Sequence, residues 1–298
     1  MQGTRTPPRD RWKISRLIAY IAASLLLSFI GMVAAGLPGS SSILPARAHG
    51  AVQADACSNA SLKGNYAFVL RGGPVLGVDG TPLSVPQPQA VLEMLLYDGA
   101  GNFTASDTAN RNGEIGREAI SGTYSVSPDC TFTEIEYTSD GTAYHSAGVL
   151  VDGGNEYHFI DTDPGAVFSA TGYRYSSGAC SNASLNGVYG SLATGFVILN
   201  PDGTRLATPL PVAVIASFSY DGAGAVTASS IASYGAGGTS YTGVGTYTVN
   251  PDCQGTATIT TSDGETGNTA FVVVDGGRAV YFVGLDNDDV FTGSSVRQ

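Results

Sequence analysis

The sequence predicts an all-β protein: two tandem antiparallel eight-stranded up-and-down β-barrels, one disulfide each, after an N-terminal signal segment. Three observations predict this fold: a long internal repeat, short apolar segments between turn signals, and four cysteines at matched spacings. The composition agrees. The chain holds 40 glycines and only 13% charged residues, which is typical of strands and tight turns rather than of surface helices.

The sequence repeats itself with a period of 123 residues. Cys57–Arg174 aligns with Cys180–Arg297 without a gap, and about 50 of the 118 aligned positions are identical. This period is too long for a solenoid unit and matches the size of a domain. We therefore predict one barrel over residues 57–174, a linker over 175–179 and a second barrel over 180–298.

Turn signals divide the first repeat into eight segments of strand length. Asp-Gly, Gly-Gly and Pro-Asp pairs between the segments supply the backbone conformations that hairpins need. Eight short strands without a helical period indicate an antiparallel meander, which removes its exposed edges by closing into a barrel. The expected strands lie near Tyr66–Arg71, Gln89–Tyr97, Asn102–Thr108, Arg117–Val126, Thr131–Thr138, Ala143–Val151, Glu156–Asp161 and Ala166–Arg174.

The four cysteines follow the repeat. Cys57 and Cys130 are 73 residues apart, as are Cys180 and Cys253. Four cysteines allow three pairings, and the repeat selects Cys57–Cys130 and Cys180–Cys253. Such bridges persist in an oxidising compartment. They leave no thiol for cysteine catalysis or for a thiolate metal site.

The two repeats agree at one end of the predicted barrel and differ at the other. Alternating strand directions place the turns 2–3, 4–5 and 6–7 at the end where strand 1 begins, and there the sequences match closely. The loops 1–2 and 3–4 lie at the opposite end, where we expect them to be long and variable. The sequence thus predicts a disulfide-stapled closed end and an open variable end.

Residues 1–48 have the pattern of a secretory signal. Basic residues precede an apolar run from Leu17 to Leu37, and a small-residue stretch ends at Ala46-Arg47-Ala48. The apolar run is long, so an uncleaved membrane anchor is the alternative. We expect a secreted, periplasmic or cell-envelope protein.

The charge of the chain excludes some partners. Without residues 1–48 the chain carries 8 basic and 24 acidic residues, a net charge of −16. Nucleic acids and anionic membrane surfaces repel such a protein. We therefore expect no nucleic-acid partner and no membrane insertion of the mature domains.

A few residues resemble the calycins, the lipocalin-like barrels. Calycins have a Gly-x-Trp at the start of strand 1 and a basic residue at the end of the last strand. This chain has Gly64, Tyr66 and Arg174 at these places, with tyrosine in place of tryptophan. The second repeat has Gly187, Tyr189 and Arg297. The resemblance implies a structural role for these six residues and a small apolar ligand inside the barrel; a barrel of the allene-oxide-cyclase or dirigent type is a similar alternative.

Glu93 is the acid with the most unusual surroundings in the sequence. It lies in Ala90–Tyr97, which is apolar on both faces, and its counterpart in the second repeat is Ala216. A carboxylate inside an apolar barrel has a raised pKa and can act as an acid or base. Alternatively, Glu93 points outward or pairs with Arg71 or Arg117.

The first repeat holds most of the ionisable residues that the second repeat lacks, so we expect it to be the acting barrel. The expected ligand-binding residues are Glu93, Arg117, Tyr144 and His145. His145 and His158 should lie on one face, roughly 13 Å apart along the strands, which is too far to share a metal ion.

Asp286, Asp288 and Asp289 cluster three carboxylates in the last turn of the second repeat. Calcium prefers such ligands, although a solvated acidic loop is the alternative. We expect no cofactor.

These observations favour an exported, non-catalytic protein that binds a small hydrophobic ligand or an envelope component at the open end of repeat 1. One alternative is a structural or adhesive surface module with side-chain-filled barrels. Another is a cofactor-free isomerase or cyclase that uses Glu93. Cavity volume separates the first two, since an eight-stranded barrel is either packed or holds one ligand.

Overall fold

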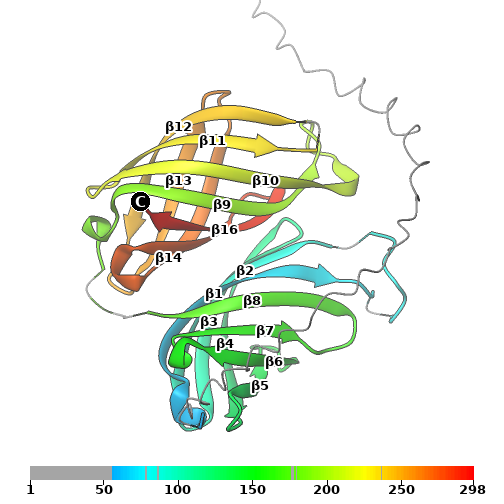
Figure 1. Cartoon of the computed structure of the whole chain (residues 1–298). Coiled ribbons are helices and arrows are strands. Elements are labelled where there is room, and N and C mark those ends of the chain that lie inside the picture. The colour runs from blue at the N-terminus through cyan, green and yellow to red at the C-terminus, as the bar shows by residue number, and fades with distance from the viewer. Residues whose placement is uncertain (1–55, 78, 86, 176–177, 179, 236) are drawn as a thin grey trace, which may run out of the picture. The chain divides into compact units, whose positions relative to one another are not determined.

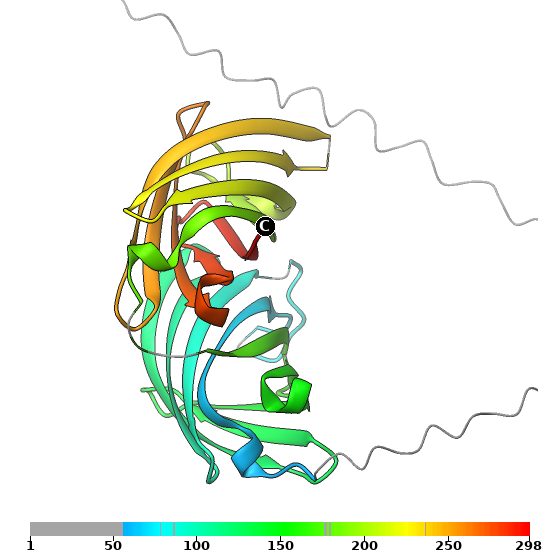
Figure 2. The same ribbon diagram turned by 60° about the vertical axis from the view of Figure 1, so that its left-hand side comes forward.

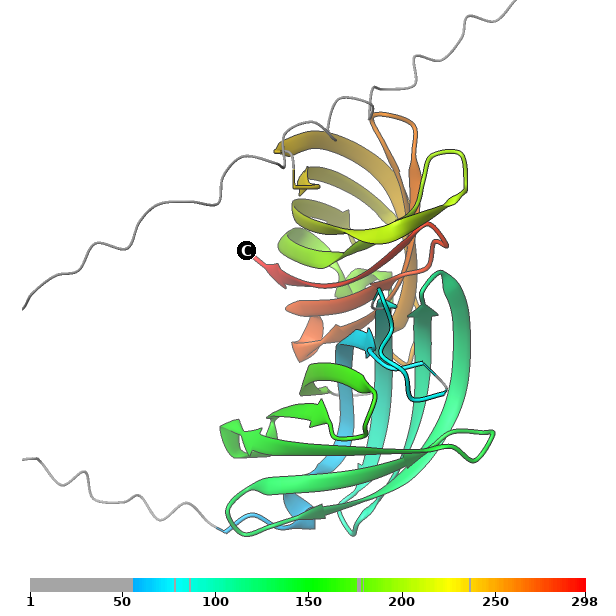
Figure 3. The same cartoon turned by 90° about the vertical axis from the view of Figure 1, so that its right-hand side faces the viewer.

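The computed structural model describes residues 56–298 except 78, 86, 176–177, 179 and 236. Its strands form two closed antiparallel barrels of eight strands, β1–β8 and β9–β16 (Figure 1). Both sheets curl back on themselves in the turned views (Figure 2 and Figure 3). The predicted all-β class and the tandem barrels are therefore confirmed. The expected signal segment over residues 1–48 lies outside the described residues and stays a prediction.

Barrel 1 is an up-and-down meander that closes where β1 pairs with β8, with Tyr66 opposite Arg174. The strands fall close to the predicted segments and are mostly longer. They are β1 (Lys63–Pro74), β2 (Gln89–Asp98), β3 (Asn102–Arg111), β4 (Glu114–Val126), β5 (Thr131–Tyr137), β6 (Ala143–Val151), β7 (Glu156–Asp161) and β8 (Ala166–Tyr175).

Barrel 2 repeats this order and closes where β9 pairs with β16, with Tyr189 opposite Arg297. Its strands are β9 (Asn186–Leu199), β10 (Arg205–Asp221), β11 (Ala225–Ser233), β12 (Gly238–Val249), β13 (Gln254–Thr261), β14 (Thr266–Val274), β15 (Ala279–Gly284) and β16 (Asp289–Arg297). Within the described part of the chain, no helix is both long and apolar enough to span a membrane.

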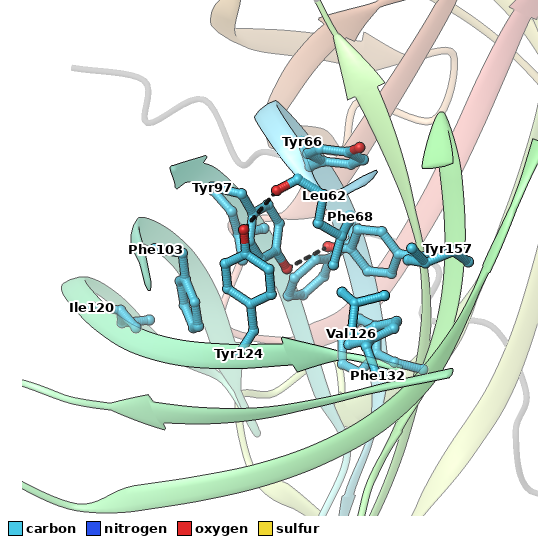
Figure 4. Close-up of a cluster of buried hydrophobic side chains, with 13 residues drawn as sticks. Leu62, Tyr66, Phe68, Tyr97, Phe103, Ile120, Tyr124, Val126, Phe132 and Tyr157 are labelled. Atoms are coloured by element: carbon cyan, nitrogen blue, oxygen red, sulfur yellow. Dashed lines mark hydrogen bonds between the residues drawn. The ribbon is translucent and has the colours of Figure 1, made fainter. Parts of the chain in front are cut away.

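The predicted closed end of barrel 1 is filled with aromatic side chains (Figure 4). The ring of Tyr97 lies edge-on to Tyr66 and Tyr124, with centroids 5.3 and 5.0 Å apart. The Tyr124 hydroxyl donates to the Leu62 carbonyl at 2.8 Å, so the chain before β1 is tied across this end. Edge-to-face rings combine a large buried area with favourable quadrupole contacts, so these rings stabilise the closed end.

Tyr66 and Arg174 contact each other where barrel 1 closes. The Tyr66 hydroxyl donates to the Gly154 carbonyl, and Arg174 Nε donates to the Tyr66 hydroxyl at 2.9 Å. The guanidinium also lies 5.2 Å from the Tyr66 ring centroid, a cation–π distance. Position 154 requires glycine: its φ is +83°, and a Cβ there would lie 2.5 Å from the Ser61 carbonyl oxygen. In barrel 2 the Tyr189 hydroxyl donates to Gly277 in the same way.

Both predicted disulfides are confirmed: Cys57 is bonded to Cys130 and Cys180 to Cys253. Each bridge ties the segment before the first strand of its barrel to the turn before the fifth. Cys130 and Cys253 have φ angles of 68° and 71°, a left-handed conformation that is uncommon outside glycine. The repeat thus extends to the backbone conformation of the closed end.

The expectation of a long 3–4 loop is wrong for barrel 1. β3 ends at Arg111 and β4 begins at Glu114, so only Asn112 and Gly113 connect them. Their φ angles of 57° and 94° match a two-residue hairpin with both central residues at positive φ, for which Asn-Gly is the preferred pair. Residues expected in the loop therefore belong to paired strands.

The apolar character of both faces of β2 has a structural cause. Leu92 and Met94 belong to a buried cluster that also contains Val272 and Val290 of barrel 2. Side chains of a strand alternate between faces, so the alternate residues Val91, Glu93 and Leu95 line the inside of barrel 1.

Candidate functional site

Barrel 1 encloses a cavity of about 330 Å³. All eight strands contribute lining residues, so the cavity is the interior of the barrel above the aromatic base. Part of its wall is apolar, formed by Phe68, Leu70, Val91, Leu95, Phe159 and Phe168. The rest is mostly acidic, which apolar strand periodicity alone does not predict.

Three carboxyl groups form a row across neighbouring strands of this cavity. Glu93 on β2 lies directly opposite Asp107 on β3, and Asp107 lies opposite Glu118 on β4. All three side chains line the cavity. Like charges directly opposite each other in a sheet repel, so the row favours protonation or a cation beside it.

Arg111 provides the guanidinium of the cavity. It lies four residues after Asp107 on the same face of β3. Its Nη2 is 2.8 Å from Asp107 Oδ2 and 3.9 Å from Glu118 Oε2. Burial raises the pKa of Asp107, and the Arg111 charge and hydrogen bond counteract this rise. Arg111 therefore neutralises charge at Asp107 and Glu118 and forms no ion pair with Glu93 among the described residues.

Two further carboxyl groups enter from β5. Glu134 accepts hydrogen bonds from the Tyr97 hydroxyl and from Ser146 Oγ, the latter at 3.2 Å. Burial raises the pKa of Glu134 to about 7 despite these bonds. Burial, together with the charges of Glu134 and Asp107, raises the pKa of Glu136 to about 7 as well. Both groups can exchange protons near neutral pH.

Glu93 is the most enclosed acid of the cavity. Its side chain points inward, the residue is 4% exposed, and its Oε1 has no hydrogen-bond partner among the described residues. Burial raises its pKa well above the usual range, and the charges of Glu136 and Asp107 add to the rise. The alternative pairing with Arg71 is not observed, because Arg71 Nη1 donates to Thr194 Oγ1 at 2.8 Å.

The prediction that Arg117 lines the site is wrong. Arg117 is exposed and is paired with Thr108, one position along from the pair Asp107–Glu118 that faces the cavity. Successive side chains of a strand point to opposite faces, so Arg117 points out of the barrel. Arg111 occupies the cationic role that the sequence reasoning gave to Arg117.

Tyr144 and His145 both lie at the rim of the cavity, and both are largely exposed. His145 is already engaged: its backbone N–H donates to Asp163 Oδ2 at 2.7 Å, and its Nδ1 lies 2.8 Å from Asp163 Oδ1. His158 is exposed on the outside of the barrel, with Nδ1 2.9 Å from Thr171 Oγ1. Of the two histidines, only His145 borders the cavity.

Barrel 2 repeats the His145 arrangement without a histidine. Asn268 stands at the equivalent position, and its backbone N–H and Nδ2 donate to the two carboxylate oxygens of Asp286 at 2.7 and 2.8 Å. The same pair of contacts therefore ties the same two strand ends in both barrels. We infer that His145 and Asp163 primarily fix this hairpin.

The contact between Asn268 and Asp286 involves one of the three aspartates that the sequence offered as calcium ligands. Asp286 is engaged by Asn268, Asp288 is exposed, and Asp289 is half-buried with its pKa raised to about 8 by burial. No group of three or more His, Cys, Asp or Glu residues in the described ranges is placed to hold a metal ion. The three aspartates thus adjoin in sequence without forming a coordination shell.

The sequence did not lead us to predict five of the charged lining residues: Asp107, Arg111, Glu118, Glu134 and Glu136. The predicted strand 3 ended at Thr108, which left Arg111 in an expected loop. The pair Asn112-Gly113 was the available signal, since Asn-Gly between alternating segments marks a two-residue hairpin. Extending both strands to that turn places Asp107, Arg111 and Glu118 on one face.

Barrel 2 has neutral residues at every position equivalent to this charged set. In the order of Glu93, Asp107, Arg111, Glu118, Glu134 and Glu136, the second repeat has Ala216, Ser230, Tyr234, Tyr241, Ala257 and Ile259. The scaffold therefore closes without these charges, and they are a property of barrel 1 alone.

No family model matches this sequence, and no curated protein matches it. Three solved chains match the structure. One is a protein of unknown function from the DUF3598 family of Nostoc punctiforme, with 10% sequence identity and a TM-score of 0.25, covering 81% of this chain and 99% of that chain. The comparison assigns no ligand and no activity to this chain.

Proposed function

We propose that this chain is a non-catalytic binding protein that acts outside the cytoplasm and holds a small ligand inside barrel 1. The observation that carries the proposal is the interior cavity with the buried Glu93 carboxyl oxygen that lacks a hydrogen-bond partner. A buried polar atom without a partner is unfavourable, and a ligand that donates a hydrogen bond removes that cost. The two disulfides support an oxidising location.

The cavity suits a compact ligand with an apolar part. Its volume of about 330 Å³ is at the lower end of the roughly 300–1,000 Å³ found for small-molecule sites. Phe68, Phe159 and Phe168 offer an apolar wall on one side. The cavity favours the binding hypothesis over a purely structural module for barrel 1.

Native mass spectrometry of the protein purified from its own host tests the proposal. We expect a small-molecule adduct on the wild-type chain and its loss in Ser146→Phe, because Ser146 lines the cavity and a phenyl ring fills it. The matched control is Thr269→Phe at the equivalent position of barrel 2, which should keep the adduct. Circular dichroism verifies that both variants fold.

The outcome for the two variants decides between the barrels. An adduct that survives Ser146→Phe and disappears in Thr269→Phe would move the ligand to barrel 2 and contradict the proposal. If Ser146→Phe does not fold, Tyr144→Ala and Tyr144→Trp at the rim alter the entrance instead, and unchanged adduct levels in both would contradict it as well.

Proton-transfer catalysis is a second candidate, favoured by one observation. Glu134 and Glu136 have pKa values of about 7 inside one cavity with Glu93, and such groups suit general acid–base chemistry. Incubating the co-purified ligand with the protein in D₂O tests this by NMR. Enzyme-dependent deuterium uptake at carbon, abolished by Glu93→Gln, would favour catalysis over binding.

A further inference from the structure

The cavity of barrel 1 has a marked excess of acids over bases. Seven carboxyl groups line it, five of them on β2 to β5, and Arg111 approaches two of these five, Asp107 and Glu118. Among the described residues, Glu93, Glu134 and Glu136 form no ion pair. A ligand that brings positive charge therefore meets three carboxyl groups that have no cation of their own.

Glu93 adds an observation independent of the charge count. Its Oε1 is buried and lacks a hydrogen-bond donor among the described residues, and the Glu93 side chain lines the cavity. An ammonium group carries three N–H donors and a full charge, and its hydrogen bonds to carboxylates are among the strong ones in proteins. A neutral alcohol offers one donor and no charge. A carboxylate ligand offers no donor, and the acids of the cavity repel its negative charge.

The opposite wall of the cavity specifies the rest of the ligand. Phe68, Phe159 and Phe168 are apolar and face the same space, so they suit an aliphatic or aromatic body. A bare metal ion gains nothing from such a wall. The described residues also contain no group of three or more metal-ligating side chains placed to bind one.

We propose that the ligand of barrel 1 is a small organic cation, an ammonium group on a compact apolar body, and that its binding expels protons from the carboxyl cluster. This inference rests on the proposed function, because it specifies the chemistry of the same cavity. The ammonium group lies beside Glu93, Glu134 and Glu136, and the apolar body lies against the three phenylalanines.

The proton release follows from the titratable groups that share the cavity with Glu93. They are Asp107 and Arg111 on β3, Glu118 on β4, Glu134 and Glu136 on β5, Tyr144 on β6 and Asp161 on β7, with Asp140 at the 5–6 turn and His145 at the rim. Carboxyl groups outnumber basic groups, so without a ligand some carboxyls retain their protons at neutral pH, consistent with the pKa of about 7 at Glu134 and Glu136. A bound cation stabilises the ionised form and lowers those pKa values.

Calorimetry on the full-length chain with three probes of matched size tests the inference. Phenethylamine is the cation, phenethyl alcohol its neutral counterpart and hydrocinnamate the anion. We expect phenethylamine to bind at least tenfold more tightly than the alcohol and hydrocinnamate not to bind. The observed enthalpy should depend on the ionisation enthalpy of the buffer, which reports proton release. Below pH 7 the amine affinity should fall about tenfold per pH unit for each linked proton.

Two single substitutions, each of which replaces one carboxyl group with an amide, locate the cation. Glu93→Gln should weaken phenethylamine at least tenfold and leave the alcohol unchanged. The control is Glu265→Gln on an exposed position of barrel 2, which should leave both unchanged. Equal weakening by both variants would reduce the effect to net charge and overturn the assignment to this cavity.

The outcomes separate this inference from the proposed function. If the alcohol binds as tightly as the amine, in a manner blocked by Ser146→Phe, the cation inference is wrong and the binding function stands. If calcium chloride binds and phenethylamine does not, the site takes a metal ion and the inference is wrong. If no probe binds and no adduct is found on the native protein, the inference and the proposed function both fail.

Discussion

The two barrels share a closed end and differ in what they enclose. Tyr66 and Tyr189 make the same hydrogen bond to Gly154 and Gly277, and the disulfides lie at equivalent positions. Inside, barrel 1 carries five carboxyl groups on β2 to β5, and barrel 2 has small or apolar residues at those five positions, apart from Tyr241. The comparison separates what the fold requires from what one copy added. The duplicated residues build the barrel, and the added charges carry the candidate function.

The largest expected effect concerns the disulfides, which both barrels share. Removing a disulfide by Cys57→Ala with Cys130→Ala should cost about 4 kcal/mol of unfolding free energy in the chain-entropy model. The equivalent pair Cys180→Ala with Cys253→Ala should cost barrel 2 about the same, since each bridge spans 73 residues. Peptide-resolved hydrogen exchange measures each barrel separately. A clearly unequal loss would show that the closed ends are not equivalent.

The next effect tests the difference between the barrels through pH. The pKa of Glu134 is about 7 in the folded state, against an ordinary glutamate value of 4.5, so the folded protein binds more protons between these two pH values. Stability therefore falls as pH rises from about 4.5 to 7 and stays low above it. The shift corresponds to roughly 3 kcal/mol.

Glu134→Gln removes this dependence and isolates it. The unfolding free energy of the variant minus that of wild type should rise by roughly 3 kcal/mol from pH 4 to pH 8. Urea denaturation of both proteins without ligand measures this difference. Glu265→Gln in barrel 2 is the control and should track wild type. A wild-type barrel 1 whose stability rises with pH over this range would contradict the buried, protonated carboxyl.

A smaller effect concerns the tyrosines that begin each barrel. Tyr66→Phe removes the hydrogen bonds to Gly154 and from Arg174 and should cost about 2 kcal/mol. Tyr189→Phe loses the bond to Gly277 and should cost about 1 kcal/mol. Thermal melts of the two variants measure both, and a neutral Tyr66→Phe would mean that the contact is incidental.

The smallest expected effect uses barrel 2 as a guide to barrel 1. Asn268 makes the contacts to Asp286 that His145 makes to Asp163. We therefore expect His145→Asn to change stability by less than about 0.5 kcal/mol and to leave phenethylamine affinity unchanged. An affinity loss of tenfold or more would show that the imidazole acts on the ligand.

Much of the fold could be predicted because local signals and the repeat agree. Turn residues marked the strands, the common spacing selected the cysteine pairs, and strand alternation identified the closed end. The predicted β6 and β7 ranges, Ala143–Val151 and Glu156–Asp161, match the structure at both ends. These features depend on nearby residues or on an exact period, which one sequence contains.

The site was only partly predictable, since it depends on which face each residue occupies. Glu93 could be singled out because a charge in an apolar strand is conspicuous. Arg117 and Arg111 could not be told apart without the position of the 3–4 turn, because a shift of one residue exchanges the two faces of a strand. The second apolar face of β2 was also ambiguous, because its partners Val272 and Val290 lie almost two hundred residues away in the chain.

The bridge between Cys57 and Cys130 has a consequence for the order of assembly. Both cysteines precede β7 and β8 in the chain, so the bond can form before these two strands have paired. Once formed, it roughly halves the length of chain between Tyr66 and Arg174, the residues whose pairing seals the barrel, and lowers the entropy lost on closure. The disulfide thus favours pairing of the last strands during folding and also stabilises the closed barrel.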